Sequence, residues 1–154
     1  MHPWSLDPDV VHLNHGSFGA CPLPVLEEQR RWQRLMETNP VLFFTETLQP
    51  AIDKSRIALA EFVGADPDGL VFVPNATAGI NSVLWSLEPH LEPGDEILIT
   101  DHTYNACRNV AEVTAQRTGA ILVEVPVPFP IETADTYSKA VLGRISPRTR
   151  IVMI

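Results

Sequence analysis

Two short polar segments contain residue types that could bind a phosphorylated aromatic ring. Asn75, Ala76 and Thr77 follow the apolar run 70–73, and the apolar residues after them recur at helical spacing. Asn is a favoured N-cap, and small residues leave the first backbone N–H groups of a helix open to a ligand. These donors and the helix dipole favour a phosphate, the dipole alone by about 0.3–1 kcal/mol at an exposed site. The alternative is an ordinary capped helix without a ligand.

The second segment follows the apolar run 96–100 and contains His102 and Tyr104. Ligands of open α/β sheets bind outside the carboxyl ends of the strands, so both segments are expected on one rim. Thr77 could hold a phosphate through its hydroxyl and its backbone N–H. His102 or Tyr104 could lie flat against an aromatic ring, or His102 could be a polar loop or capping residue. A ligand that has both a phosphate and an aromatic ring would be either a nucleotide or pyridoxal phosphate.

Several other classes of function are disfavoured by missing patterns. Neither G-x-G-x-x-G nor G-x-x-x-x-G-K-[ST] occurs, which argues against the dinucleotide and P-loop folds. The net charge is −8 and the basic residues are scattered, which argues against nucleic acid or an anionic membrane as a partner. No apolar stretch approaches the ~20 residues of a membrane span. The first residues do not resemble a secretory signal, so a cytoplasmic location is expected.

Metal and disulfide sites are not expected either. Cys21 and Cys107 lie far apart and outside any CxxC pattern, so we expect reduced thiols, buried or incidental. His12 and His15 are three residues apart but have no evident third ligand.

The alternation of strand and helix patterns predicts a three-layer α/β/α fold with a mostly parallel sheet. Strands are expected at 70–73, 96–100, 120–125 and 150–154. Helices are expected from residue 24 to before Asn39, over 48–63 with Gly64 as terminator, after Asn75, after Asn105, and over 134–145. The expected buried face of the 48–63 helix consists of Leu48, Ile52, Leu59, Phe62 and Val63.

Two further segments have less regular patterns. Residues 10–24 are expected to form a Gly- and Pro-containing loop, and the aromatic segment 41–47 has no assigned structure. We expect Phe43 and Phe44 to serve packing or an oligomer contact.

Four segments carry a resemblance to known proteins: LNHGSFGACP (13–22), NPVLFF (39–44), FVGADPDGLVFVPNATAGIN (62–81) and DHTYNACRNV (101–110). Taken together, they resemble the amino-terminal part of the class V aminotransferase family, whose members are fold type I pyridoxal phosphate enzymes. Within that family the chain is most similar to the isopenicillin N epimerase-like branch, which is related to cysteine desulfurases and C–S lyases. The four segments extend over essentially the whole chain, in order.

The resemblance implies specific cofactor contacts. Ala76 and Thr77, together with Asn75, would bind the phosphate of pyridoxal 5′-phosphate. His102, which follows an acidic residue as in relatives, would stack on the pyridine ring, and Tyr104 is the second candidate for this stack.

The resemblance also implies that Asn14, His15, Gly16 and Ser17 form a loop on the substrate side of the pocket. Relatives of this branch often have a basic residue within NPV-x-FF, where this chain has Leu42. This departure argues against a substrate-carboxylate role for that position.

By the same resemblance, residues 1–47 would line the active site and residues 48–154 would form the first part of the large cofactor-binding domain. The Schiff-base lysine, the acidic partner of the pyridine nitrogen and the carboxyl-terminal domain would lie beyond residue 154. Lys54 and Lys139 are the only lysines of the chain and do not match that lysine's place. The 154 residues by themselves are therefore expected to be inactive.

The implied function is that of a pyridoxal phosphate enzyme of amino acid metabolism. It would form an external aldimine with an amino acid substrate and remove the Cα proton, leading to epimerisation, C–S cleavage or transamination. The implied assembly is a homodimer with Phe43, Phe44 and the amino-terminal loop near the contact. Two alternatives stay open: a non-catalytic fragment or degenerate relative that binds a partner, and a nucleotide-binding α/β domain.

Overall fold

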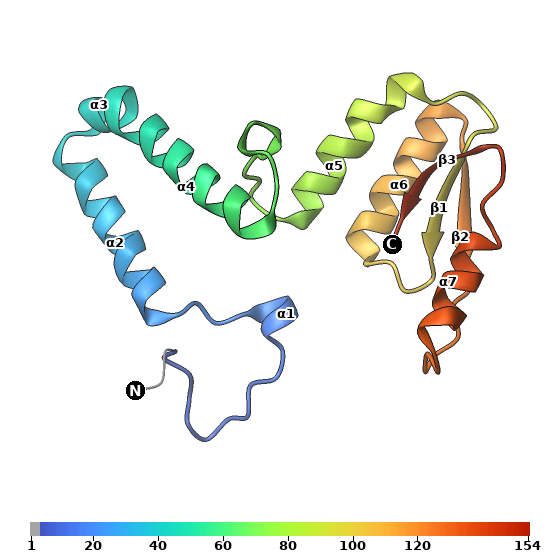
Figure 1. The fold of residues 1–154 in the computed structure, drawn as a ribbon, viewed down its shortest axis with the longest axis horizontal. Coiled ribbons are helices and arrows are strands. Elements are labelled where there is room, and N and C mark those ends of the chain that lie inside the picture. The colour runs from blue at the N-terminus through green and yellow to red at the C-terminus, as the bar shows by residue number, and fades with distance from the viewer. Residues whose placement is uncertain (1–3) are drawn as a thin grey trace. The chain divides into compact units, whose positions relative to one another are not determined.

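The computed structural model describes residues 4–154 and divides into two units, Met1–Val71 and Phe72–Ile154. The first unit is helical and the second has α/β architecture (Figure 1). This structural division does not coincide with the predicted one, in which residues 1–47 line the active site and residues 48–154 begin the cofactor-binding domain. Those roles stay predictions.

The first unit consists of helices that begin and end at residues with clear local signals. α2 ends at Thr38, directly before the predicted stop at Asn39 and Pro40. α4 ends at Gly64, whose φ of 69° is the left-handed conformation that favours glycine. The elements of this unit are α1 (His15–Phe18), α2 (Leu23–Thr38), α3 (Pro40–Leu42), the π-helical turn η1 (Phe43–Thr47), α4 (Leu48–Val63) and the 3₁₀ turn η2 (Pro67–Gly69).

The prediction of the buried face of α4 was wrong. Ala60 is the buried residue of this helix, whereas the Phe62 side chain is 86% exposed and Val63 is also exposed. Helical spacing identifies an apolar face, but it does not show which element covers that face.

The aromatic segment that could not be assigned from sequence forms α3 and η1. Phe43 is buried and meets Trp32 and Phe44 edge to face, with ring centroids 6.3 and 5.4 Å apart. Phe44 is exposed. The packing role is therefore confirmed for Phe43, and an oligomer contact at Phe44 stays a prediction.

The second unit contains three parallel strands in the order β2-β1-β3. Each neighbour of β1 is reached through a helical crossover, as the alternating pattern predicts. The elements are α5 (Ala76–Leu87), the 3₁₀ turn η3 (Glu88–His90), β1 (Glu96–Thr100), α6 (Asn105–Thr118), β2 (Ile121–Val125), α7 (Ala134–Leu142) and β3 (Thr149–Met153).

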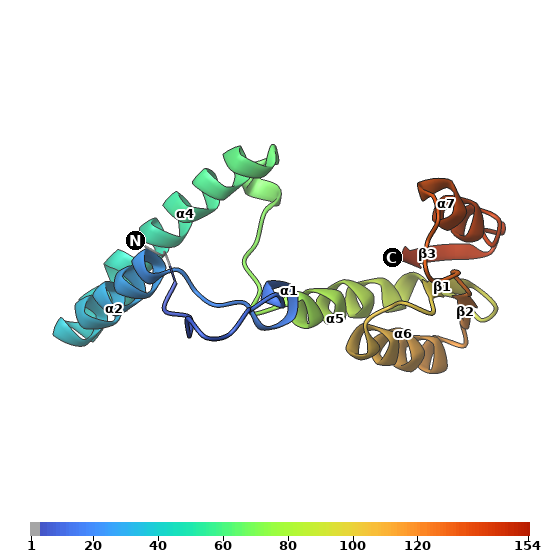
Figure 2. The same cartoon turned by 90° about the horizontal axis from the view of Figure 1, so that it is seen from below.

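Both faces of the sheet are covered, which confirms the three-layer arrangement (Figure 2). Ile97 and Ile99 of β1 pack on one face against Leu84 of α5 and Ala111 of α6. Leu98 points to the other face, where it packs with Val141 of α7 and other apolar residues. The middle strand is buried at every position, as is typical of a central parallel strand.

The predicted strand at 70–73 is absent, so the sheet has three strands rather than four. Leu70 has an extended backbone, but Val71 and Phe72 are exposed and no strand among residues 4–154 pairs with this segment. Extended residues form a strand only when a neighbouring backbone satisfies their N–H and C=O groups.

The last helix also differs from its prediction, because α7 ends at Leu142 instead of residue 145. Gly143 follows, and glycine has low helix propensity.

A polar cluster joins the amino ends of β1 and β3. The Glu96 carboxylate is nearly buried and accepts hydrogen bonds from Ser146 Oγ (2.6 Å), Thr149 Oγ1 (3.0 Å) and the Arg148 guanidinium (3.1 Å). These hydrogen bonds, that from Ser146 first, lower the pKa of Glu96 below its ordinary value of 4.5, against the opposing effect of burial. Asp95 beside it binds Arg150 Nε at 3.1 Å.

Candidate cofactor site

The first residues of α5 form a capped helix start with two accessible donors. Asn75 is extended (φ −166°, ψ 171°), and its side-chain oxygen accepts from the backbone N–H of Ala78 at 2.8 Å. Asn75 is thus the N-cap that the sequence predicts. Within residues 4–154, the backbone N–H groups of Ala76 and Thr77 meet no hydrogen-bond acceptor. The cap therefore leaves open the two amides that were predicted to bind phosphate.

The donor set at this helix start suits a phosphate. Thr77 is half-buried and adds a hydroxyl to the two amides. The first turn contains no acidic residue that would compete with an anion. Donors without nearby acceptors, at the positive end of a helix dipole, match a dianionic phosphoester.

The carboxyl end of β1 turns tightly before α6 begins. Thr103 donates its backbone N–H to Thr100 O at 3.0 Å, and its Oγ1 accepts from Thr100 N at 3.1 Å. Asp101 lies inside this turn and donates its backbone N–H to Val125 O at 3.1 Å. The turn that carries His102 is thereby attached to the end of β2.

His102 and Tyr104 differ in how firmly they are held. The His102 side chain is 36% exposed, with Nε2 3.7 Å from Asp101 Oδ1. Its ring also meets Phe129 edge to face at 6.1 Å. Tyr104 is the N-cap residue of α6 and its side chain is 72% exposed. His102 is thus the more firmly held of the two, and the stacking role predicted for one of them stays a prediction.

Both predicted cofactor segments belong to the second unit and lie at the same end of it. α5 and β1 run in opposite directions, so the amino end of α5 and the carboxyl end of β1 are on one rim (Figure 1). An ion pair between Arg108 and Glu124 fastens the first turns of α6 to β2 on this side.

The predicted substrate loop contains a helical turn in the first unit. Asn14 is the N-cap of α1, and its side-chain oxygen accepts from Ser17 N at 3.3 Å. His15 packs against Trp4 and His12, with ring centroids 5.7 and 4.6 Å apart. Gly16 lies within the same turn, where an added Cβ would meet no atom within 4 Å. The substrate-side role of these residues stays a prediction.

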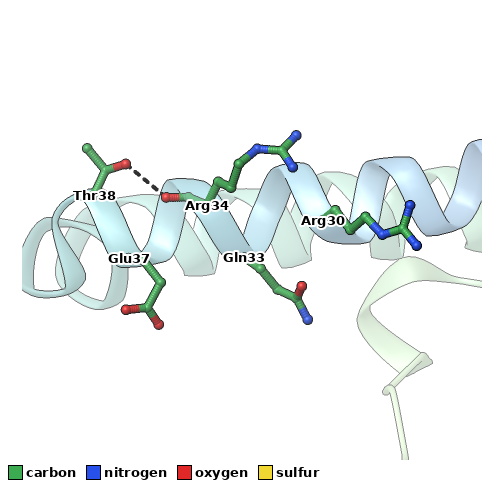
Figure 3. A pocket seen from close by; sticks show the side chains of 5 residues that line it. All are labelled: Arg30, Gln33, Arg34, Glu37 and Thr38. Atoms are coloured by element: carbon green, nitrogen blue, oxygen red, sulfur yellow. Dashed lines mark hydrogen bonds between the residues drawn. The ribbon is translucent and has the colours of Figure 1, made fainter.

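A cavity of about 520 Å³ lies along α2, and none of the site residues predicted from the sequence lines it (Figure 3). Its lining mixes charges of both signs, and Thr38 Oγ1 donates to Arg34 O at 2.8 Å. The lining residues are Arg30, Gln33, Arg34, Glu37 and Thr38. All five come from one helix, so they do not converge on a ligand from several sides.

The structure also places the cysteines and lysines that the sequence analysis considers. Cys21 and Cys107 are free thiols, and Cys21 is exposed rather than buried. No group of three metal-ligating side chains occurs among residues 4–154. Lys54 is exposed on α4, and Lys139 is exposed on α7 next to Asp135. No helix in this range is long and apolar enough to cross a membrane.

Sequence reasoning missed two residues next to His102. The sequence shows Asp101 as the acidic residue before His102 but not its contact with the Val127 amide, and Phe129 lies far away in sequence. No local pattern shows that the connection after β2 returns to His102, because that contact depends on the order of the strands.

Comparison with known proteins decides the family. The family profile described as Aminotransferase class-V matches residues 20–154. Isopenicillin N epimerase of Amycolatopsis lactamdurans is 36% identical over 149 residues, which is 96% of this chain and 37% of that protein. The chain belongs to the class V aminotransferase family.

Other class V relatives agree with this assignment. The putative L-cysteine desulfhydrase 1 of Oryza sativa subsp. japonica is 40% identical over 132 residues, which is 82% of this chain and 27% of that protein. A mutant C-DES structure with glycine covalently linked to its pyridoxal phosphate cofactor superposes with a TM-score of 0.79 at 29% identity. That match covers 94% of this chain and 37% of C-DES.

These matches confirm three predictions: the family, the pyridoxal phosphate-dependent transferase fold, and pyridoxal phosphate as the cofactor of the family. The chain spans between about a quarter and somewhat more than a third of the length of these relatives. The nucleotide-binding alternative receives no support from them.

Proposed function

We propose that this chain is the phosphate-binding and ring-binding part of a pyridoxal phosphate enzyme that cleaves the C–S bond of a cysteine-type amino acid. The observation that carries this proposal is the Asn75-capped start of α5, with the open amides of Ala76 and Thr77 on the same rim as His102. Similarity to the cysteine desulfhydrase and to C-DES supports C–S cleavage.

Each residue of this rim would have a separate task. The amides of Ala76 and Thr77 and the Thr77 hydroxyl would bind the phosphate, and Asn75 would keep those donors aligned. His102 would lie against one face of the pyridine ring and fix its plane. When bound, the cofactor supplies an electron sink that lets the substrate Cα proton leave.

The substrate side would involve Asn14, His15, Gly16 and Ser17 of the first unit. The hydrogen bond from Ser17 N to Asn14 holds this turn together. We further propose that the lysine which binds the cofactor covalently lies outside these 154 residues. Lys54 and Lys139 occupy exposed helix faces, which supports this reading.

A second candidate reaction is epimerisation at Cα. It is favoured by 36% identity to isopenicillin N epimerase across 96% of the chain. Both reactions begin with loss of the Cα proton, so the rim residues serve either one. Transamination, homodimer formation and a cytoplasmic location stay predictions.

Two measurements on the full-length protein test the proposal. The first is pyruvate release from L-cysteine or cystine, alongside chiral analysis of amino acid substrates incubated in D₂O. Pyruvate formed together with sulfide from L-cysteine, or together with cysteine persulfide from cystine, supports C–S cleavage. Inversion with deuterium at Cα supports the epimerase. A protein that does not bind pyridoxal 5′-phosphate would instead support the non-catalytic alternative.

The second measurement concerns Thr77. Thr77→Val removes one donor and is expected to weaken pyridoxal 5′-phosphate binding by roughly tenfold to a hundredfold, since hydrogen bonds to charged groups contribute about 1.5–3 kcal/mol. Ser82→Ala, on an exposed position of the same helix, is the matched control and is expected to leave the affinity unchanged. Equal affinities for the two variants would contradict the phosphate site.

A further inference from the structure

We propose that Asp101 is a positioning residue that sets the orientation of the His102 ring. The proposal rests on the proposed cofactor role of His102. It adds a residue whose part in the site is visible only in the tertiary structure.

The Asp101 carboxylate is held in place by the backbone around it. Its Oδ1 accepts from the Val127 backbone N–H at 3.0 Å, and its own N–H donates to Val125 O at 3.1 Å. Asp101 thus bridges the end of β1 and the connection after β2. A carboxylate bonded in this way points in one fixed direction.

The same oxygen lies 3.7 Å from His102 Nε2. A fixed negative charge beside this nitrogen favours a ring orientation with an Nε2–H directed toward Asp101. Phe129 meets the His102 ring edge to face at 6.1 Å. Because Phe129 is 85% exposed, it offers weak support by itself, and the orientation depends chiefly on Asp101.

Orientation of this ring affects binding because an aromatic ligand requires a flat face in a defined plane. A side chain held in its binding orientation loses less conformational freedom when the ligand arrives. Asp101 is therefore expected to raise affinity for a flat, phosphorylated ring through His102 and without touching the ligand.

The test is a double-mutant cycle in the full-length protein, with affinity for pyridoxal 5′-phosphate measured by fluorescence titration. Asp101→Asn keeps a side-chain oxygen for the Val127 N–H but removes the charge beside His102. It is expected to weaken binding by about twofold to fivefold, as for loss of a partly exposed charge contact. His102→Phe keeps a stacking ring but has no Nε2 to orient. In that background Asp101→Asn is expected to change affinity by less than about twofold.

Two controls separate positioning from general damage. Asp135→Asn removes an exposed carboxylate of α7 and is expected to leave affinity unchanged. The thermal midpoint of the cofactor-free Asp101→Asn protein is expected to match the wild type, because the hydrogen bond to Val127 is retained. Crystal structures of the cofactor-free proteins are expected to show Nε2 facing residue 101 in the wild type and turned away in Asp101→Asn.

The outcomes distinguish this inference from the proposed function. Equal loss of affinity from Asp101→Asn in both backgrounds would overturn the positioning role while leaving the cofactor site intact. Unchanged affinity in Asp101→Asn would overturn it as well. If the wild type does not bind pyridoxal 5′-phosphate, the proposed function fails, and the ring orientation in the crystal structures still decides the role of Asp101.

Discussion

At the scale of single residues, the candidate site depends on which polar groups are already occupied. Asn75 uses its side chain to satisfy Ala78 N, which leaves the next two amides toward the start of α5 for a ligand. Asp101 shares one oxygen between Val127 and His102. In both cases a hydrogen bond within the protein fixes a side chain next to groups that we propose bind the cofactor. These groups are the amides of Ala76 and Thr77 beside Asn75, and the His102 ring beside Asp101.

Replacing Asn75 tests the cap. Asn75→Ala removes the acceptor for Ala78 N and is expected to lower the free energy of unfolding by about 1 kcal/mol and to weaken pyridoxal 5′-phosphate binding. Asn75→Ser retains a capping oxygen and is expected to keep most of the stability and most of the affinity for pyridoxal 5′-phosphate. Urea unfolding and cofactor titration of the full-length variants measure the two effects. If Asn75→Ala and Asn75→Ser behave alike, the cap has no role in the site.

At the scale of elements, side chains from β3 and its preceding turn hold β1 at the end of the sheet opposite the candidate site. Glu96 on β1 accepts from Ser146, Thr149 and Arg148, which come from the approach to β3 and from its first residue. The pairing of β1 with β3 shifts register between Glu96 and Ile97. The hydrogen bonds of Glu96 thus join the start of β3 to β1 at the point where the backbone pairing of the two strands is irregular.

The lowered pKa of Glu96 predicts a dependence of stability on pH. Since the folded-state pKa lies below its ordinary value of 4.5, the ionised carboxylate stabilises the fold above about that pH. This stabilisation is lost as the pH falls through the folded-state pKa. Urea unfolding between pH 7 and pH 3 is expected to show a steeper acid loss in the wild type than in Glu96→Gln. If the stabilities of the wild type and Glu96→Gln fall in parallel with decreasing pH, the ionised Glu96 carboxylate does not stabilise the fold.

The helical unit offers a matched pair of aromatic residues. Phe43 is buried against Trp32, whereas the neighbouring Phe44 is 59% exposed. Phe43→Ala is expected to lower the free energy of unfolding by about 3 kcal/mol, and Phe44→Ala by less than about 1 kcal/mol. Chemical unfolding measures the loss of stability in each variant. Sedimentation of Phe44→Ala in the analytical ultracentrifuge tests the predicted homodimer contact. Similar losses of stability for the two variants would contradict the packing described for Phe43.

At the scale of the whole molecule, the chain matches only part of the length of its relatives. The 154 residues expressed alone are expected to release no sulfide from L-cysteine, because we propose that the lysine which binds the cofactor covalently is neither Lys54 nor Lys139. The full-length protein is expected to be active under the same conditions. Turnover by the short chain, lost on replacing either lysine, would contradict this prediction.

The sequence alone determined the features that arise from local interactions. The cap at Asn75, the helix end at Gly64 and strand β1 follow from residue type and spacing within a few positions. The motifs were also sufficient to indicate the family and its cofactor, because each of the four segments that resemble the family is a continuous stretch of the chain.

Only the tertiary structure decided which apolar residues are covered and which distant groups meet. The run 70–73 has strand-forming residues, but no strand between residues 4 and 154 lies beside it, and α4 presents Phe62 to solvent. Asp101 reaches Val127, 26 positions along the chain, because two parallel strands end side by side. Local preference acts through the chain itself, whereas burial and long-range hydrogen bonds depend on what another segment brings to the same place.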